Sequence, residues 1–341
     1  MPILIALGSA ILFGLSTPVA KLLLGEADPW ILAGILYGGA GVGLSVVYLV
    51  GRRSEARLGS GGLAFLAGAV TAGGIVGPVL LLFGLTRVAA SAASLLLTLE
   101  GVLTALLAWF AFEENFDRRI AVGMASIVAG AVVLNWQPGM TVSDLLGPAA
   151  IVGACLAWAI DNNLTRKVSL SDPVQIAMIK GLVAGPVNLA IGLLAGAALP
   201  GPGVIAWAAL TGFLGYGVSL VLFVLALRHL GTARTGAYFS VAPFLGALAA
   251  VPLLGDAVSA QLVAAGALMA VGVWLHATER HEHVHDHEEL EHEHRHTHDE
   301  HHDHVHDGPV DVRRPHSHRH RHGRLRHSHP HVPDSHHRHS H

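Results

Sequence analysis

Long apolar segments alternate with short polar ones along the first 278 residues of the chain. Each apolar segment is between 18 and 25 residues long and carries few or no charged side chains. A helix of about 20 apolar residues crosses a hydrocarbon core of about 30 Å. The pattern therefore predicts an all-α integral membrane protein with ten transmembrane helices. The expected helices cover residues 3–24, 30–50, 62–83, 89–112, 119–136, 145–162, 174–198, 203–226, 233–254 and 259–276.

The apolar region contains an internal repeat. Two pairs of segments resemble each other: GSAILFGLSTPVAK (8–21) with GACLAWAIDNNLTR (153–166), and LFGLTRVAASAASLLLTLEGVLTALLAW (82–109) with LFVLALRHLGTARTGAYFSVAPFLGALAA (222–250). The offset of 140–145 residues corresponds to five helices. An odd number of helices per repeat forces opposite orientations in the membrane, the inverted-repeat plan of many secondary transporters. We expect one five-helix repeat in residues 1–140, a second in 141–278, and a separate tail in 279–341.

The repeated blocks carry a family resemblance. The blocks FGLSTPVAK (13–21) and WAIDNNLTRK (158–167), the acidic turns at Glu113/Glu114 and Asp256, and the ten-helix duplication resemble the EamA-type transporters of the drug/metabolite transporter (DMT) superfamily. The resemblance covers residues 3–276. It implies cytoplasmic termini and alternating access through a central cavity, with small metabolites, amino acids or toxic compounds as cargo.

Two features depart from that family pattern. Glu100-Gly101 stands where a helix break containing proline, such as Ala242-Pro243, is usual. The histidine-rich residues 279–341 have no counterpart in a typical member. The resemblance therefore indicates the fold and leaves the substrate open.

Glu100 is the charged residue nearest to the middle of an expected span. An ionisable group near the membrane midplane costs at least a few kcal/mol unless it faces protein or water. One interpretation is a proton-coupling carboxylate, or a ligand for a cationic substrate, that takes up a proton on one side and releases it on the other. The alternative is a structural carboxyl group hydrogen-bonded through Thr98 or Thr104.

Other polar residues within or beside the spans admit two interpretations each. Lys180 lies about 10 Å from the expected start of its helix at 1.5 Å per residue. It can pair with Glu100 or an anionic substrate, or its stem can extend to the interface. Asp161, Asn162 and Asn163 can face a cavity or form the frayed end of the sixth helix, and we favour the helix end.

Position alone adds three residues that could line a cavity. The resulting set of candidate substrate and coupling residues is Glu100, Lys180, Asn162, Asn188, Trp158 and Tyr238. We expect the single cysteine, Cys155, to be a small buried residue. Glycines four residues apart should allow close helix packing in lipid, as at Gly34/Gly38, Gly73/Gly77, Gly181/Gly185 and Gly192/Gly196.

The tail differs from the rest of the chain, because 23 of the 25 histidines lie in residues 281–341. It is too polar to build a core, and we expect it to be disordered. Alternating histidines let a flexible chain wrap a divalent transition metal, although a passive or pH-sensitive tail fits equally. The candidate metal ligands are His281, His283, His285, His287, His292, His294, His296, His298, His301, His302, His304 and His306.

The distribution of charge predicts the orientation. Arginine and lysine are concentrated in every second loop, and such an excess is typical of cytoplasmic loops. This places both termini on the cytoplasmic side of the cytoplasmic membrane. The basic loop residues on that side are Arg52, Arg53, Arg57, Arg118, Arg119, Arg166, Lys167, Arg228 and Arg234, against Arg87 alone on the other. Neither part of the chain is basic enough to indicate nucleic acid as a partner, whereas the lipid bilayer, a small-molecule substrate and a homodimer are compatible with it.

The sequence favours a secondary transporter that moves a small metabolite or toxic compound, with Glu100 in proton coupling. We expect such a transporter to require no cofactor, although its tail could bind a divalent transition metal. The alternative is a transporter or tolerance protein for Ni, Co or Zn whose tail collects or senses the ion. The expected spans hold few ligands for that role, since His276 is the one histidine inside them. We do not expect an enzyme, because an intramembrane enzyme needs a catalytic pair and only Glu100 is deep.

Overall fold

A computed structural model describes residues 2–51, 58–112, 118–136, 139, 141–169, 171–278, 281–287, 290–296, 316–322 and 325–331. Within these ranges, eight helical segments are long and apolar enough to cross a membrane. Two shorter apolar helices cover residues 242–254 and 260–275. The predicted all-α membrane fold is confirmed.

The first repeat contains five spans, two of which are interrupted. The third span changes to π-helical geometry and back, and the fourth is broken at Leu97-Thr98. The elements are α1 (Pro2–Leu23); α2 (Pro29–Val50); η1 (Ser60–Gly62), α3 (Leu63–Ala69), the π-helix η2 (Val70–Val76) and α4 (Gly77–Leu85); α5 (Ala90–Leu96) and α6 (Leu99–Phe112); and α7 (Arg118–Asn135).

The second repeat follows the same plan. Its elements are η3 (Val142–Leu145) and α8 (Leu146–Arg166); α9 (Pro173–Leu194); α10 (Pro202–Gly212), the π-helix η4 (Phe213–Val218) and α11 (Ser219–Phe239); α12 (Ala242–Leu254); and α13 (Ala260–Ala277). The rings of Phe223 and Phe239 have centroids 4.9 Å apart. Sixteen residues of straight helix would separate them by about 24 Å. α11 therefore doubles back and contributes to both the eighth and the ninth span.

Three local features recur in the two repeats. α2 and α9 are both 22 residues long and begin with an Asp-Pro pair whose carboxylate caps the helix: Asp28 accepts from Trp30 N at 2.8 Å, and Asp172 from Val174 N at 2.9 Å. The π-helices η2 and η4 lie at equivalent positions. The break between α5 and α6 corresponds to the break between α11 and α12. The predicted inverted repeats are confirmed, and the exact boundaries of the repeats stay a prediction.

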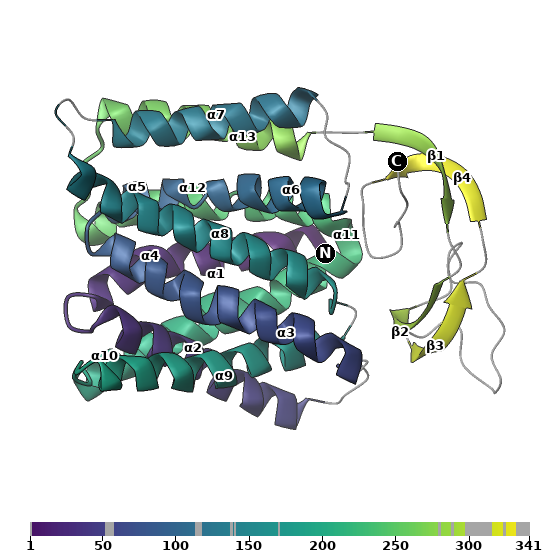
Figure 1. Ribbon diagram of the computed structural model, residues 1–341, viewed down its shortest axis with the longest axis horizontal. Helices are drawn as coiled ribbons and strands as arrows, with labels where there is room; N and C mark the ends of the chain where they lie inside the picture. The colour runs from purple at the N-terminus through teal and green to yellow at the C-terminus, as the bar shows by residue number, and fades with distance from the viewer. Residues whose placement is uncertain are drawn as a thin grey trace.

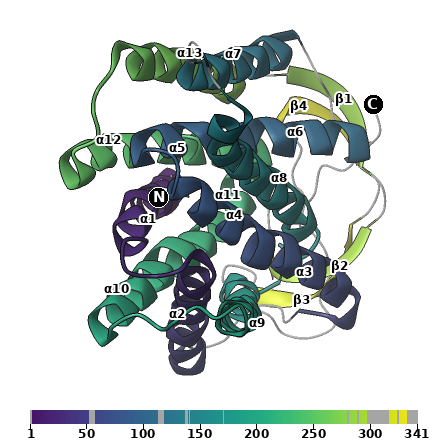
Figure 2. The same cartoon turned by 60° about the vertical axis from the view of Figure 1, so that its left-hand side comes forward.

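The repeats are interlocked. α2 packs against α9 and α7 packs against α13, so corresponding helices meet across the repeat interface (Figures 1 and 2). The first helix of each repeat packs mainly on the other repeat: α1 contacts α11 and α12, and α8 contacts α3, α4 and α6. In Figure 1 the N-terminus and the end of α13 lie at the same end of the bundle.

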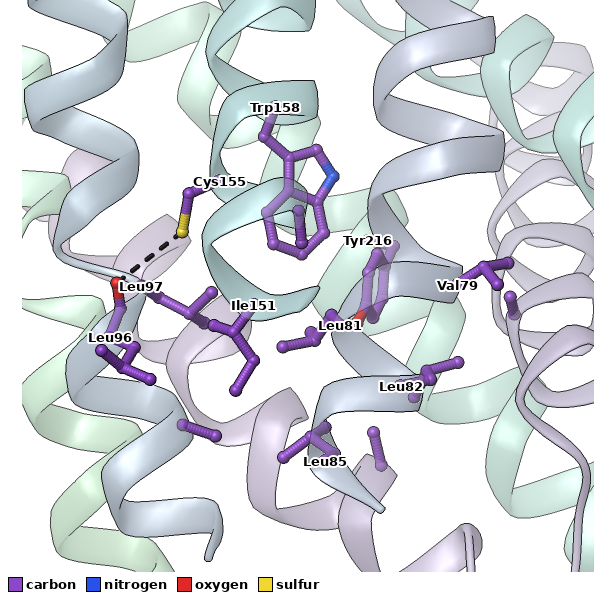
Figure 3. Close-up of a cluster of buried hydrophobic side chains, with 14 of the residues drawn as sticks. Val79, Leu81, Leu82, Leu85, Leu96, Leu97, Ile151, Cys155, Trp158 and Tyr216 are labelled. Atoms are coloured by element: carbon purple, nitrogen blue, oxygen red, sulfur yellow. Dashed lines mark hydrogen bonds between the residues drawn. The ribbon is translucent and has the colours of Figure 1, made fainter. Parts of the chain in front are cut away.

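Side chains of α4, α5 and α8 form one part of the buried core. Figure 3 shows Leu81 of α4 pointing toward Ile151 of α8, Leu96 of α5 on the other side of Ile151, and Leu82 of α4 directed away from it. All four are fully or almost fully buried. Cys155 is also fully buried, and its Sγ lies 3.7 Å from the carbonyl oxygen of Leu96. The expected role of Cys155 as a small buried residue is confirmed.

Glycines bring α2 and α9 close together. A Cβ atom on Gly41 would lie 2.5 Å from the backbone nitrogen of Leu182, and one on Gly181 would lie 2.4 Å from Gly41 N. Burial of apolar surface gives little drive for association in lipid, so this close backbone contact stabilises the pair through van der Waals packing. Gly196, one of the glycines expected to pack, instead lies in the turn after α9 with φ of 89°.

The described part of the tail contains four short strands. β1 (His281–His287) pairs antiparallel with β4 (Leu325–His331), and β2 (Leu290–His296) pairs with β3 (His316–His322). The register places His283 opposite His329 and His294 opposite His318. The alternating sequence has the two-residue period of a strand, and pairing satisfies backbone groups without a core. A two-stranded ladder by itself is only marginally stable in water.

Two glycines of α2 provide a matched test of this packing. Gly41→Ala should destabilise the protein by about 1–3 kcal/mol, because the new methyl group meets the backbone of α9. Gly38→Ala should be neutral or slightly stabilising, since no atom lies within 4 Å of its Cβ position and alanine favours helix. Heating the detergent-solubilised variants and measuring the remaining monodisperse protein compares them. Equal stability of Gly41→Ala and the wild type would contradict the close α2–α9 contact.

Candidate functional site

A cavity of about 660 Å³, including its mouth, lies between the two repeats. Its described lining comes from α1, α2, α6, α8, α9, η4 and α11. Glu100, Asp161, Asn162 and Lys180 supply its main polar groups.

Aromatic rings form the apolar wall of the cavity. Phe13 is central, with its ring centroid 5.9 Å from Trp158, 6.1 Å from Tyr216 and 5.4 Å from Phe239. Tyr37 continues the wall at 5.3 Å from Tyr216. Edge-to-face and tilted pairs at these separations are favourable arrangements for aromatic rings. The contacts hold rings from α1, α2, α8, η4 and α11 in one cluster.

The π-helix η2 holds part of that wall in place. The hydroxyl group of Tyr37 and the indole Nε1 of Trp158 both donate to the carbonyl oxygen of Gly73, at 2.6 and 3.0 Å. Asn188 donates to the next carbonyl oxygen, that of Gly74, at 2.9 Å. Pro78 follows η2 and has no N–H with which to satisfy these oxygens. Side chains from three other helices supply the missing donors.

The break in the fourth span places Glu100 in the first turn of α6, facing the cavity. Asn162 of α8 donates from Nδ2 to Glu100 Oε1 at 2.8 Å and lies 3.5 Å from the hydroxyl oxygen of Thr104. The hydroxyl group of Thr98 donates instead to the carbonyl oxygen of Leu95. Among the described residues, Asn162 is therefore the side chain that donates to Glu100.

Lys180 pairs with Asp161. Its Nζ lies 2.5 Å from Asp161 Oδ1 and donates to the hydroxyl oxygen of Thr165 at 2.9 Å. The side chain of Lys180 is 3% exposed and that of Asp161 is 12% exposed. The ion pair with Asp161 contradicts a pair with Glu100 and an extension to the interface, and contact of Lys180 with an anionic substrate stays a prediction. The partner of Lys180 is instead Asp161, which lies 19 residues earlier in the chain.

The polar patch at 161–163 is not a frayed helix end, which corrects the interpretation that the sequence favoured. α8 continues to Arg166, and Asp161 and Asn163 are buried. Asn163 donates to the carbonyl oxygens of Ala159 and Thr104. A Cβ atom on Gly73 would overlap the Asp161 carboxylate, so glycine at this position leaves the space that the carboxylate fills.

The cavity contains four of the six candidate substrate and coupling residues: Glu100, Lys180, Asn162 and Trp158. Asn188 and Tyr238 are not among the residues that line it. Asn188 is fully buried against η2, and Tyr238 precedes the lining residue Phe239 by one position, a rotation of about 100° on a helix. The aromatic wall was not predicted, although Phe13 and Trp158 occupy the same position in the repeated blocks 8–21 and 153–166.

The candidate metal ligands fall into two groups. Seven of them, from His281 to His296, lie in β1 and β2, for which the structure gives the backbone path. His298, His301, His302, His304 and His306 lie outside the described residues. The part of the chain that the structure describes holds no group of three or more His, Cys, Asp or Glu side chains placed to bind a metal ion. Metal binding by the tail stays a prediction.

Comparison with known proteins identifies the family. The model of the EamA-like transporter family matches residues 1–136 and again residues 145–278. The chain belongs to the EamA-like transporter family. An uncharacterized transporter from Methanothermobacter thermautotrophicus is 27% identical over 287 residues, which cover 78% of this chain and 83% of that protein. A protein crystal structure shares the fold, with a TM-score of 0.62 and 19% identity over 81% of this chain and 98% of the other.

The buried ion pair of this EamA-like transporter should depend on both partners. Asp161→Asn should cost about 3–5 kcal/mol, because it leaves the Lys180 ammonium group buried without its counterion. The double substitution Asp161→Asn with Lys180→Met removes both charges and should recover much of the loss. Thermal unfolding of the three proteins in detergent measures this. Additive losses in the double variant would show that the two groups do not interact.

Proposed function

We propose that the chain is a proton-coupled secondary transporter that moves a small organic molecule across the cytoplasmic membrane by alternating access. The single observation that supports this most is the position of Glu100. Its carboxylate lies at the break between α5 and α6 and borders the cavity between two inverted repeats. An intramembrane carboxyl group that faces a cavity is suited to carry a proton.

Closure of one end of the bundle supports the alternating-access part of the proposal. Lys21, near the end of α1, donates to the carbonyl oxygens of Leu85, the last residue of α4, and of Val88 in the following turn. Asp256, between α12 and α13, accepts from Ser91 N at 2.7 Å, at the start of α5. The Lys21 bonds join α1 to the end of α4 within the first repeat, and the Asp256 bond joins the two repeats at this end. The ion pair of Asp161 and Lys180 lies toward the opposite end, where α8 finishes and α9 begins.

The positions of arginine and lysine support the orientation. They put the Lys21 end outside and the Arg166 end in the cytoplasm, together with both termini. With this orientation the cavity lies toward the cytoplasm and the outer end is closed.

The cavity favours transport over catalysis. A general acid or base has to be a titratable group that is free to exchange a proton with the substrate. Asp161 is held by Lys180 and Thr165, which leaves Glu100 as the one carboxylate of the described lining outside an ion pair. We propose that the substrate crosses unchanged and that no cofactor takes part.

Glu100→Gln tests the coupling. Glutamine keeps the shape and can still accept from Asn162 but cannot carry a proton. We expect the variant to fold, to lose pH-driven accumulation of substrate and to keep exchange across the membrane. The measurement uses reconstituted protein on a solid-supported membrane, with currents recorded under a pH gradient for amines, amino acids and organic acids.

Glu26→Gln is the matched control, because it makes the same chemical change in an exposed turn between α1 and α2. It should retain wild-type currents. Wild-type pH dependence in Glu100→Gln would instead make Glu100 a structural carboxyl group. Absence of any pH-dependent current in the wild type would contradict proton coupling.

The second candidate, transport of Ni, Co or Zn, rests on the composition of the tail. The described cavity lining contains neither histidine nor cysteine, the usual ligands of these ions. Removal of residues 279–341 separates the two candidates. The truncated protein should insert and transport organic substrates at the wild-type rate, since the tail is too polar to contribute to an apolar core. Loss of organic transport with loss of metal tolerance in a cell-based assay would favour the metal candidate.

A further inference from the structure

We propose that the cavity selects organic cations with a flat apolar body and that Glu100 is the group that binds their charge. This inference rests on the proposed function, because it names the class of molecule that the transporter carries. It depends on three features of the cavity: the balance of its charges, the unequal access to them, and the rings around them.

The charges of the described lining do not cancel. Glu100, Asp161 and Lys180 are its formally charged side chains. The ammonium group of Lys180 and the carboxylate of Asp161 neutralise each other at 2.5 Å. Glu100 has one described polar partner, the neutral amide of Asn162. An ionised Glu100 therefore leaves the cavity with one uncompensated negative charge.

Access to the two signs of charge is unequal. The Lys180 side chain is 3% exposed and its donors are directed at Asp161 and Thr165. Glu100 is partly exposed on the cavity side. An anionic substrate would have to displace Asp161 from Lys180, and a zwitterion would have to do the same with its carboxylate. A cation meets Glu100 without breaking the ion pair.

The wall favours a cation that is organic. Six aromatic side chains line the cavity: Phe13, Tyr37, Trp158, Tyr216, Phe223 and Phe239. Neighbouring rings have centroids 4.9 to 6.1 Å apart, so one bound cation can lie within about 6 Å of several ring faces, the range of cation–π attraction. Alkali and alkaline-earth ions prefer six or more oxygen ligands, which this wall does not supply.

The test measures binding of three flat bicyclic probes to the full-length protein in lipid nanodiscs by calorimetry. N-methylquinolinium carries a positive charge, quinoline at alkaline pH is neutral, and 2-naphthoate is negative. We expect the cation to bind at least ten-fold more tightly than quinoline and the anion not to bind. Equal affinity for the cation and quinoline, or tighter binding of the anion, would overturn the inference.

Variants assign the effect to named groups. Glu100→Gln should lower the affinity for N-methylquinolinium to that for quinoline and leave quinoline unchanged. Phe13→Leu keeps an apolar side chain but removes a ring face, so the affinity for the cation should fall roughly ten-fold. Glu26→Gln should change nothing. Wild-type cation affinity in a Glu100→Gln protein that elutes as a single species would overturn the role of Glu100.

The outcome is separable from the proposed function, because the binding measurement uses no gradient and no transport. If the organic cations fail to bind while Glu100-dependent currents arise with other compounds, the substrate class is wrong and proton-coupled transport stands. If the cations bind through Glu100 and no pH-dependent current exists, proton coupling is wrong and the cation site stands.

Discussion

The carbonyl oxygen of Gly73 accepts two side-chain hydrogen bonds in a region where lipid offers no donor, and much of the cavity depends on this contact. A bilayer core contains no water to satisfy backbone groups, so an irregular helix persists there only if protein donors replace the lost bonds. Pro78 removes the backbone donor, and Tyr37 and Trp158 replace it. The same two bonds orient two rings of the cavity wall. One requirement of backbone chemistry therefore positions a binding surface.

The second repeat meets the same requirement differently. Its π-helix η4 has no proline, and a reciprocal pair of hydrogen bonds lies directly after it: the hydroxyl group of Ser9 donates to the carbonyl oxygen of Ser219, and that of Ser219 to the carbonyl oxygen of Ser9. Both π-helices pack beside the first helix of the opposite repeat. Such turns are frequent at functional sites. Their equivalent positions give each repeat one π-helical turn beside the first helix of the other repeat.

The pattern of apolar residues predicted the spans to within a few residues, because length and hydropathy alone decide whether a helix can cross lipid. The depth of Glu100 followed from counting residues along its helix. The partner of Lys180 could not be predicted by counting residues. The count gives the position of a residue along its helix, but it does not tell which face of α8 or α6 points toward Lys180. The helix break before Glu100 carries no proline to mark it. The aromatic wall combines rings from five separate elements, which no local pattern connects.

The exchange of first helices between the repeats has a consequence for biosynthesis. α1 contacts α11 and α12, which begin roughly 200 residues later in the chain. At about 5–20 residues per second of synthesis, α1 waits roughly 10–40 s in the membrane before its partners exist. Ser9, which is buried and exchanges hydrogen bonds with Ser219 of α11 in the finished protein, is without that partner during the interval. The first repeat is therefore incomplete while the second repeat is being synthesised. The translocation machinery or the lipid has to cover α1 during that time and then release it to helices that are made much later.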